Sequence, residues 1–197
     1  HNMYPKMKFG ESSATEHGFC LDTDNADGQI SEDEFKKITA EMNKLIKQNI
    51  AIEKIMVPLD EALSMVEGDE YQTALINENA VNGQVEMYQQ GDFKYLGGVQ
   101  LPATGAVKVF QILSVAGAYW KGASSNPMLQ RVYGTAFYKQ KDLDAELERR
   151  KEAQERDHRV IGNKLDLFFV DPKVGAGLPY WMPKGATIRR TIERYII

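Results

Sequence analysis

The stretch that decides the fold is SVAGAYWKGASSNPMLQRVYGTAFYKQKDLDAELERRKEAQERDHR, which runs from Ser114 to Arg159. In its first half, Gly117 and Gly122 bracket the aromatic pair Tyr119 and Trp120. That pattern is consistent with a strand end at which the backbone turns closely. The first half therefore predicts the closing strands of a β-containing unit, with the aromatic pair packed rather than reactive.

The second half of the stretch changes pattern at Asp142 and continues as a charged run to about Gly162. Leu143, Leu147 and Val160 interrupt the charges at helical intervals, which predicts a long exposed helix. The charges are mixed in sign and often four residues apart. They therefore favour a solvated, ion-paired helix face over an RNA-binding one.

Upstream of this stretch, the sequence alternates helix and strand signals. Ser31 and Glu34 form a capping-box pattern before the apolar face of a helix. Two further short helices are expected over 60–67 and 69–77, separated by Gly68. Strands are expected over 51–57, 84–90, 93–96, 106–115 and 132–138. Glycine-containing turns between the strands suit antiparallel pairing, so the sequence predicts an α+β fold, an antiparallel or mixed sheet with flanking helices.

Downstream of the charged helix, residues 165–170 predict a short strand and residues 171–177 a loop rich in glycine and proline. A last helix is expected to start near Lys184. Its apolar stripe consists of Ile188, Ile192, Tyr195 and Ile196. Such a stripe needs a partner, so we expect this helix to pack on a neighbouring copy or on the linker region. The chain lacks an initiator methionine and stops within this helical pattern, so it is expected to be a fragment.

The composition is that of an acidic globular chain. Of its 197 residues, 43% are hydrophobic and 26% are charged, and the net charge at pH 7 is −4. Cys20 is the single cysteine, and we expect it to fill the core. A single cysteine excludes an intrachain disulfide and a multi-cysteine zinc site, and it favours the reducing cytoplasm as the compartment. No secretory or membrane-spanning segment is present, so no membrane partner is expected. The acidic balance argues against broad non-specific binding of nucleic acid.

One acidic loop imitates a calcium site. Residues 22–30, DTDNADGQI, resemble the loop of an EF-hand, which needs oxygen ligands at fixed positions and a glycine at the sixth. If Gly28 is sixth, Thr23 takes the first position, where a carboxylate is required, and Glu34 takes the twelfth. No entering helix is expected before the loop. We therefore expect an acidic loop that leads into a capped helix, and no metal site.

The blocks AGAYWKG, MLQRVYGTAF and RDHR resemble threonyl-tRNA synthetases in their order and spacing. In that family, they lie where the editing domain passes into the catalytic domain. The resemblance extends from Lys8 to the end of the chain. It implies an editing-like second additional domain over 1–139, a linker helix over 140–162 and the truncated beginning of a class II catalytic domain over 163–197.

The resemblance also implies a function and partners. The parent synthetase would attach threonine to its tRNA as a cytoplasmic homodimer, with ATP, magnesium and zinc bound in the catalytic domain. The motifs for these groups are expected beyond Ile197, so no cofactor or metal is expected in this chain. The implied partner is threonine tRNA.

The segment that would carry editing chemistry departs from the family. Family members hydrolyse mistakenly formed seryl-tRNA with two helical histidines and with a Cys and a His in a segment similar to DLCRGPH. Here Asp92 and Phe93 are followed by KYLGGVQLP, one residue shorter, with Tyr95 in the place of Asp and Gln100 in the place of His. The Cys is missing, and the helical histidines are expected upstream of His1.

These replacements remove proton-transfer groups from the segment. Glutamine forms hydrogen bonds but transfers no proton near neutral pH, and tyrosine is bulkier and weakly acidic. We therefore expect no catalytic residue, and a degenerate editing pocket formed by Tyr95, Gly97, Gly98, Gln100 and His17.

Two alternatives stay open. In the first, the chain is an active tRNA deacylase in which Lys94 or His17 serves in place of the missing groups. In the second, it is a non-catalytic module that docks the acceptor stem of the tRNA or regulates the parent. Lys108, Lys121 and Arg131 would then be its phosphate contacts.

Overall fold

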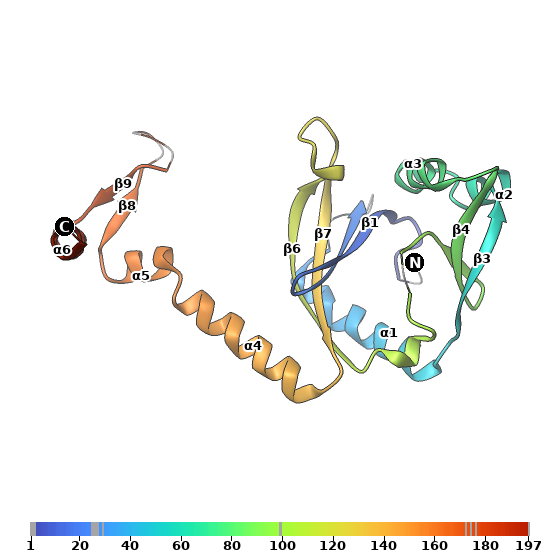
Figure 1. Ribbon diagram of the computed structural model, residues 1–197, viewed down its shortest axis with the longest axis horizontal. Helices are drawn as coiled ribbons and strands as arrows, with labels where there is room; N and C mark the ends of the chain where they lie inside the picture. The colour runs from blue at the N-terminus through green and yellow to red at the C-terminus, as the bar shows by residue number, and fades with distance from the viewer. Residues whose placement is uncertain are drawn as a thin grey trace. The chain divides into compact units, whose positions relative to one another are not determined.

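The computed structural model describes residues 3–24, 28, 30–98, 100–171, 173, 175 and 177–196 (Figure 1). The chain forms two compact units, His1–Leu143 and Asp144–Ile197. The sheets of both units are antiparallel, and helices flank them. The α+β class expected from the sequence is confirmed.

The larger sheet of the first unit has the strand order β1-β2-β7-β6. Its strands are β1 (Lys8–Thr15), β2 (Gly18–Asp24), β6 (Val109–Tyr119) and β7 (Met128–Phe137). Phe19 of β2 pairs with Gly134 of β7, and a Cβ atom on Gly134 would lie 2.3 Å from the Cζ of Phe19. Gly134 thus leaves the space in which the ring of Phe19 crosses the neighbouring strand.

An ion pair crosses the same sheet. Asp22 is 1% exposed and lies opposite Arg131 in the β2–β7 register. The guanidinium donates two hydrogen bonds to the carboxylate, of 2.6 Å from Nε and 2.8 Å from Nη2. The hydrogen bonding with Asp22 raises the pKa of Arg131. A bidentate pair of this kind fixes the geometry of both side chains, so Arg131 is held by the sheet.

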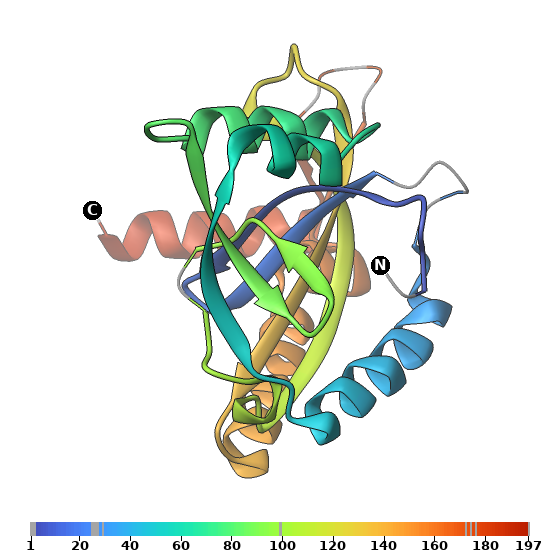
Figure 2. The same cartoon turned by 90° about the vertical axis from the view of Figure 1, so that its right-hand side faces the viewer.

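The smaller sheet of the first unit has the order β3-β4-β5 and carries two helices. Its elements are β3 (Ile52–Pro58), α2 (Leu59–Met65), α3 (Glu70–Asn79), β4 (Gln84–Gln90) and β5 (Phe93–Tyr95). Figure 2 shows α2 and α3 beside one another at the ends of β3 and β4. The buried cluster between helices and sheet consists of Val57, Ala62, Ile76, Val85 and Met87. Val85 and Met87 are alternate residues of β4, as burial of one sheet face requires.

The capping box predicted from the sequence begins the first helix. A 3₁₀ turn, Glu32–Glu34, leads into α1 (Phe35–Gln48). The Glu34 carboxylate accepts a 3.0 Å hydrogen bond from the Ser31 amide and a 2.7 Å bond from the Tyr4 hydroxyl. Another 3₁₀ turn, Thr104–Ala106, contacts α1. Glu34 therefore joins the N-terminal segment to the start of α1.

Glu34 should make the stability of the chain sensitive to acid. The Ser31 amide, and then the Tyr4 hydroxyl, lower the pKa of Glu34. A carboxyl group with a lowered folded-state pKa contributes stability that is present above its unfolded pKa and is lost as the pH falls through the folded value. Glu34→Gln keeps an acceptor but does not titrate, so we expect its urea midpoint to decline less than the native one between about pH 5 and pH 3. Identical declines would contradict this role.

The long helix expected over 142–162 is interrupted. It consists of α4 (Gln140–Glu155) and α5 (His158–Lys164), separated by Arg156 and Asp157. The Asp157 carboxylate accepts a 2.7 Å hydrogen bond from the Arg159 amide and so caps the second helix. Aspartate is a preferred N-cap because it satisfies an amide that lacks a partner within the helix.

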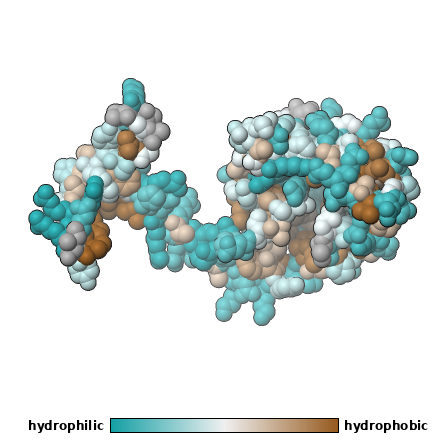
Figure 3. Space-filling view, turned by 45° about the horizontal axis from the view of Figure 1, so that its top comes forward, coloured by the Kyte–Doolittle hydropathy of each residue, from teal (hydrophilic) through white to brown (hydrophobic). Residues whose placement is uncertain are grey.

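The ion-paired character predicted for this region is confirmed. Glu146 accepts hydrogen bonds from Arg149 at 2.8 Å and from Arg150 at 2.7 Å. Arg149, and then Arg150, lower the pKa of Glu146 to about 2. The helix surface is accordingly hydrophilic in the space-filling view (Figure 3).

The second unit has little buried apolar surface among its described residues. Besides α4 and α5, it contains β8 (Phe168–Val170), β9 (Pro179–Trp181) and α6 (Pro183–Ile196). A Cβ atom on Gly185 would lie 2.0 Å from the carbonyl oxygen of Leu167, so α6 approaches the chain before β8 closely. The apolar stripe of α6 is exposed. Its packing on a neighbouring copy or on the linker region stays a prediction.

Candidate functional site

The first unit contains a cavity of about 570 Å³, which we name the β1 cleft. It lies between β1, α3 and the smaller sheet. Its lining consists of Gly10, Glu11, Ser12, Met56, Gln72, Leu75, Asn79, Val81, Gln84, Glu86, Leu96, Gly97 and Gly98. The volume is within the roughly 300–1,000 Å³ typical of small-molecule sites.

Hydrogen bonds between α3 and β1 hold two walls of the β1 cleft together. The Gln72 side-chain amide donates to the carbonyl oxygens of Phe9, at 2.7 Å, and Gly10, at 3.3 Å. The Asp69 carboxylate caps α3 by accepting from the amides of Tyr71 and Gln72, and it also accepts from the Phe9 amide at 2.9 Å. Neither Asp69 nor Gln72 was predicted from the sequence as a residue of this cleft, although an aspartate after a turn glycine is a helix-cap signal.

The residues of segment 95–100 that were predicted to form the editing pocket line two different cavities. Gly97 and Gly98 line the β1 cleft. Tyr95 and Gln100 instead line a second cavity of about 240 Å³ beside α1, which we name the α1 hollow, with Met42, Leu45 and Ile46 on its α1 wall. Tyr95, Gly97, Gly98 and Gln100 are therefore close together but line two different cavities, and His17 lines neither of them.

The Gln100 side chain forms hydrogen bonds with residues on both sides of the boundary between the two cavities. Its side-chain oxygen accepts a 3.4 Å hydrogen bond from the Tyr95 hydroxyl, and its Nε2 donates to the Gly98 carbonyl oxygen at 3.1 Å. A Cβ atom on Gly97 would lie 2.7 Å from that Nε2. Burial raises the pKa of Tyr95, so its hydroxyl stays protonated near neutral pH.

The other candidate catalytic groups lie outside the lining of the β1 cleft. His17 lies in the turn between β1 and β2, with its side chain 57% exposed and its Nε2 3.9 Å from the Glu16 carboxylate. Lys94 donates to the Glu61 carboxylate at 3.2 Å. Cys20 is buried in β2 with its Sγ 3.2 Å from the Ser13 hydroxyl, as expected for a core residue.

The ionisable side chains that line the β1 cleft are two carboxylates. Glu11 is exposed, and Glu86 forms a 2.6 Å ion pair with Lys54. The hydrogen bond with Glu86 raises the pKa of Lys54, so this amine carries a proton near neutral pH and is no general base. The described lining includes no histidine, cysteine or lysine. The cleft thus offers hydrogen-bonding groups and two carboxylates, and its described lining lacks the histidine and cysteine side chains that the resemblance implies for editing.

The three predicted phosphate contacts have partners within the chain. Lys108 donates to the Gly105 carbonyl oxygen at 3.0 Å. Lys121, in the 3₁₀ turn Trp120–Gly122, forms an ion pair with Glu78 and lies over the Trp120 ring at 5.0 Å from its centroid. Arg131 is bound to Asp22, as described above. These three cations do not form a single free basic patch.

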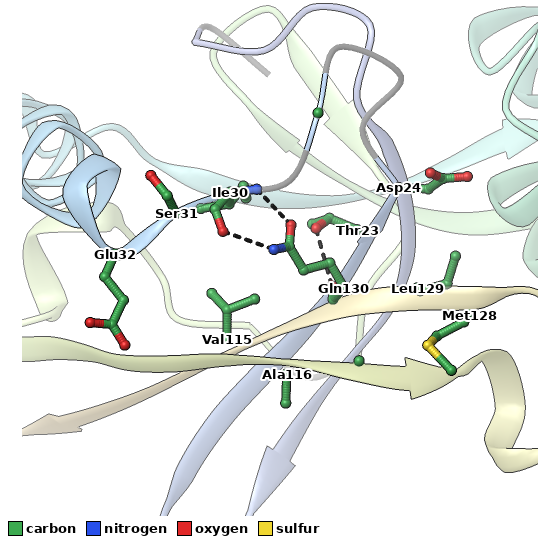
Figure 4. Close-up of a pocket in the computed structure, with 12 residues that line it drawn as sticks. Thr23, Asp24, Ile30, Ser31, Glu32, Val115, Ala116, Met128, Leu129 and Gln130 are labelled. Atoms are coloured by element: carbon green, nitrogen blue, oxygen red, sulfur yellow. Dashed lines mark hydrogen bonds between the residues drawn. The ribbon is translucent and has the colours of Figure 1, made fainter.

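A third cavity, of about 410 Å³, lies beside Gln130 (Figure 4). The Gln130 side chain accepts from the Ile30 amide at 2.7 Å and donates to the Ile30 carbonyl oxygen at 2.8 Å, and Thr23 donates to the Gln130 backbone. These contacts hold the backbone at Ile30, just before α1, against β7. Of the EF-hand-like loop, positions 25–27 and 29 lie outside the described residues, while Glu34 caps the helix.

Neither a metal-ligating cluster nor a membrane-spanning helix occurs among the described residues. No group of three or more His, Cys, Asp or Glu side chains in this part of the chain is arranged to hold a metal ion. None of the described helices combines the length and the apolar character needed to cross a bilayer.

Comparison with known proteins first defines the class of domain. Residues 85–133, from β4 into β7, match the family described as the second additional domain of threonyl and alanyl tRNA synthetases. The curated proteins that are similar to the whole chain are threonine–tRNA ligases. The ligase of Ligilactobacillus salivarius is 66% identical over 100% of this chain and 31% of its own length. Those of Lactiplantibacillus plantarum and Streptococcus suis are 60% and 49% identical over 99% and 98% of this chain.

The chain spans about 31% of the length of the first of these relatives. Over its whole length it corresponds to a segment of threonyl-tRNA synthetases, which confirms the resemblance found in the sequence.

Proposed function

We propose that this chain is the part of a threonine–tRNA ligase that holds a degenerate editing domain and leads into the catalytic domain. The parent attaches threonine to threonine tRNA in the cytoplasm, as a homodimer that uses ATP, magnesium and zinc. The editing domain does not hydrolyse seryl-tRNA. The observation that carries the proposal is the described lining of the β1 cleft, which lacks histidine, cysteine and lysine.

Editing in the family relies on histidine and cysteine side chains, which the described lining does not supply. A water molecule must be activated against the ester carbonyl, and the ribose hydroxyl of the tRNA must receive a proton as it leaves. Gln72 and Asn79 can only form hydrogen bonds. The Gln72 amide is also engaged by the backbone of β1. The cleft is therefore suited to hold an aminoacylated end without cleaving it.

The hypothesis that the chain is an active deacylase has less support than the proposal above. Its candidate groups were Lys94 and His17, and the first is paired with Glu61 while the second lies in an exposed turn outside the cleft lining. A docking module that uses Lys108, Lys121 and Arg131 also gains little support, since each of the three is bound within the chain.

The proposal is tested by deacylation of seryl-tRNA and threonyl-tRNA with the full-length parent protein, which includes the residues upstream of His1. We expect both esters to decay at the rate measured in buffer. The variants His17→Ala and Lys94→Met should give that same rate, because neither side chain lines the cleft. Hydrolysis of seryl-tRNA that His17→Ala or Lys94→Met abolishes would replace this proposal with the deacylase.

The docking alternative is tested by gel shift with threonine tRNA. Lys121→Ala alters an exposed ion pair, whereas Arg131→Ala removes the partner of a buried carboxylate. We expect neither to change tRNA affinity as long as the chain is folded. Loss of affinity in folded Lys121→Ala would favour the docking module.

A further inference from the structure

The α1 hollow is separate from the proposed editing cleft, and its lining differs in kind. Its volume of about 240 Å³ is below the roughly 300–1,000 Å³ of sites for whole drug-sized ligands, so it suits a single ring system. Met42, Leu45 and Ile46 give it an aliphatic wall from α1, and Tyr95 contributes an aromatic ring. A flat apolar group would fit such a lining.

Tyr95 belongs to a row of three aromatic rings on one face of β4 and β5. It lies opposite Tyr88 in the strand register, with the ring centroids 6.2 Å apart and the planes at 32°. On its own strand, the ring of Phe93 lies 5.7 Å away at 19° and is 43% exposed. The rings of Phe93 and Tyr95 are thus nearly parallel, and that of Tyr88 is tilted from Tyr95. Aromatic rings on a sheet offer a surface on which nucleobases stack, because every base has a π-face.

Polar groups beside the rings suit the edge of a base. Gln90 and Gln100 both line the hollow, and an amide side chain offers donors and an acceptor. The bonds of Gln100 to Tyr95 and Gly98 hold its amide in place. Lys54 lies opposite Tyr88 on the neighbouring strand, where it places a cation, paired with Glu86, near the stacking row.

We propose that the α1 hollow binds one unpaired nucleobase of an RNA strand, stacked against Tyr95. Tyr88 and Phe93 extend the stacking surface to adjoining bases. In taking RNA as the ligand, the site rests on the proposed function, in which the partner is a tRNA. Hydrolysis plays no part in it, so the site binds whether or not the β1 cleft edits.

The test is fluorescence anisotropy of a labelled single-stranded RNA heptamer, titrated with the 197-residue chain. Tyr95→Leu removes the ring and should weaken binding about 5- to 150-fold, the range that corresponds to stacking of one base. Tyr95→Phe keeps the ring and should bind as the native chain does. The control Tyr138→Ala changes an aromatic residue that is 84% exposed outside the row, and it should have no effect.

A second arm keeps the test decisive if Tyr95→Leu fails to fold. Phe93→Ala, at an exposed end of the row, should weaken binding by at least about fivefold while its melting curve stays native. The RNA scanned with single abasic positions should lose the most affinity at one position, and Tyr95→Leu should add no further loss there. Failure of the chain to bind RNA, or native affinity in Phe93→Ala and Tyr95→Leu, overturns the base site. Either outcome leaves the deacylation test of the proposed function independent.

Discussion

Replacing Arg131 with methionine is expected to lower the free energy of unfolding by about 3 kcal/mol, because it leaves a buried carboxylate without its partner. Asp22 is 1% exposed, and both of its oxygens accept hydrogen bonds from Arg131. Methionine retains the apolar stem, so the loss reports the charge rather than a cavity. The Arg131 side chain is 30% exposed, which places the effect at the low end of the range for buried pairs.

Urea unfolding of Arg131→Met and of the double variant Asp22→Leu/Arg131→Met measures this effect. Removal of both charges should restore most of the lost stability, since an apolar pair of similar volume replaces a buried ion pair at little cost. If Arg131→Met is as stable as the native chain, Arg131 does not serve the sheet. Its assignment as a phosphate contact would then regain support.

The second large effect is expected in the core beneath α3. Ile76 is 0% exposed and packs with Val57, Val85 and Met87, so Ile76→Ala should cost about 2–5 kcal/mol through lost burial and the cavity it leaves. The matched variant Ile76→Val removes one methylene and should cost about 0.5–1.5 kcal/mol.

Differential scanning calorimetry of both variants checks this order. Ile76 anchors the helix that carries Gln72 and Asn79 to the β1 cleft, so the core supports the geometry of the candidate site. Equal melting temperatures for Ile76→Ala and Ile76→Val would show that the site collapses without a cavity and would contradict the packing described.

Local signals in the sequence were enough to predict most elements of the first unit. The capping box at Ser31 and Glu34 marked the start of α1, and Gly68 marked the turn between α2 and α3. The strand β4 covers the residues 84–90 that were expected from the sequence, and alternate residues in its first half are buried. The break before α5 was missed, although Asp157 is a capping residue type, because the surrounding charges continue the helical pattern.

The candidate site could be predicted only in part. The residues Tyr95, Gly97, Gly98 and Gln100 are close in sequence, yet the path of the backbone directs them to different cavities. Local sequence spacing does not reveal that division. The partner of Arg131 lies 109 positions away in sequence, and strand order, rather than local propensity, brings it into contact.

We propose that the β1 cleft lacks the groups needed to edit. Its most direct test is the single-turnover rate at which seryl-tRNA loses serine in the presence of excess full-length parent protein. We expect the same rate constant as in buffer alone. A rate constant well above the buffer value, with threonyl-tRNA left intact, would contradict it.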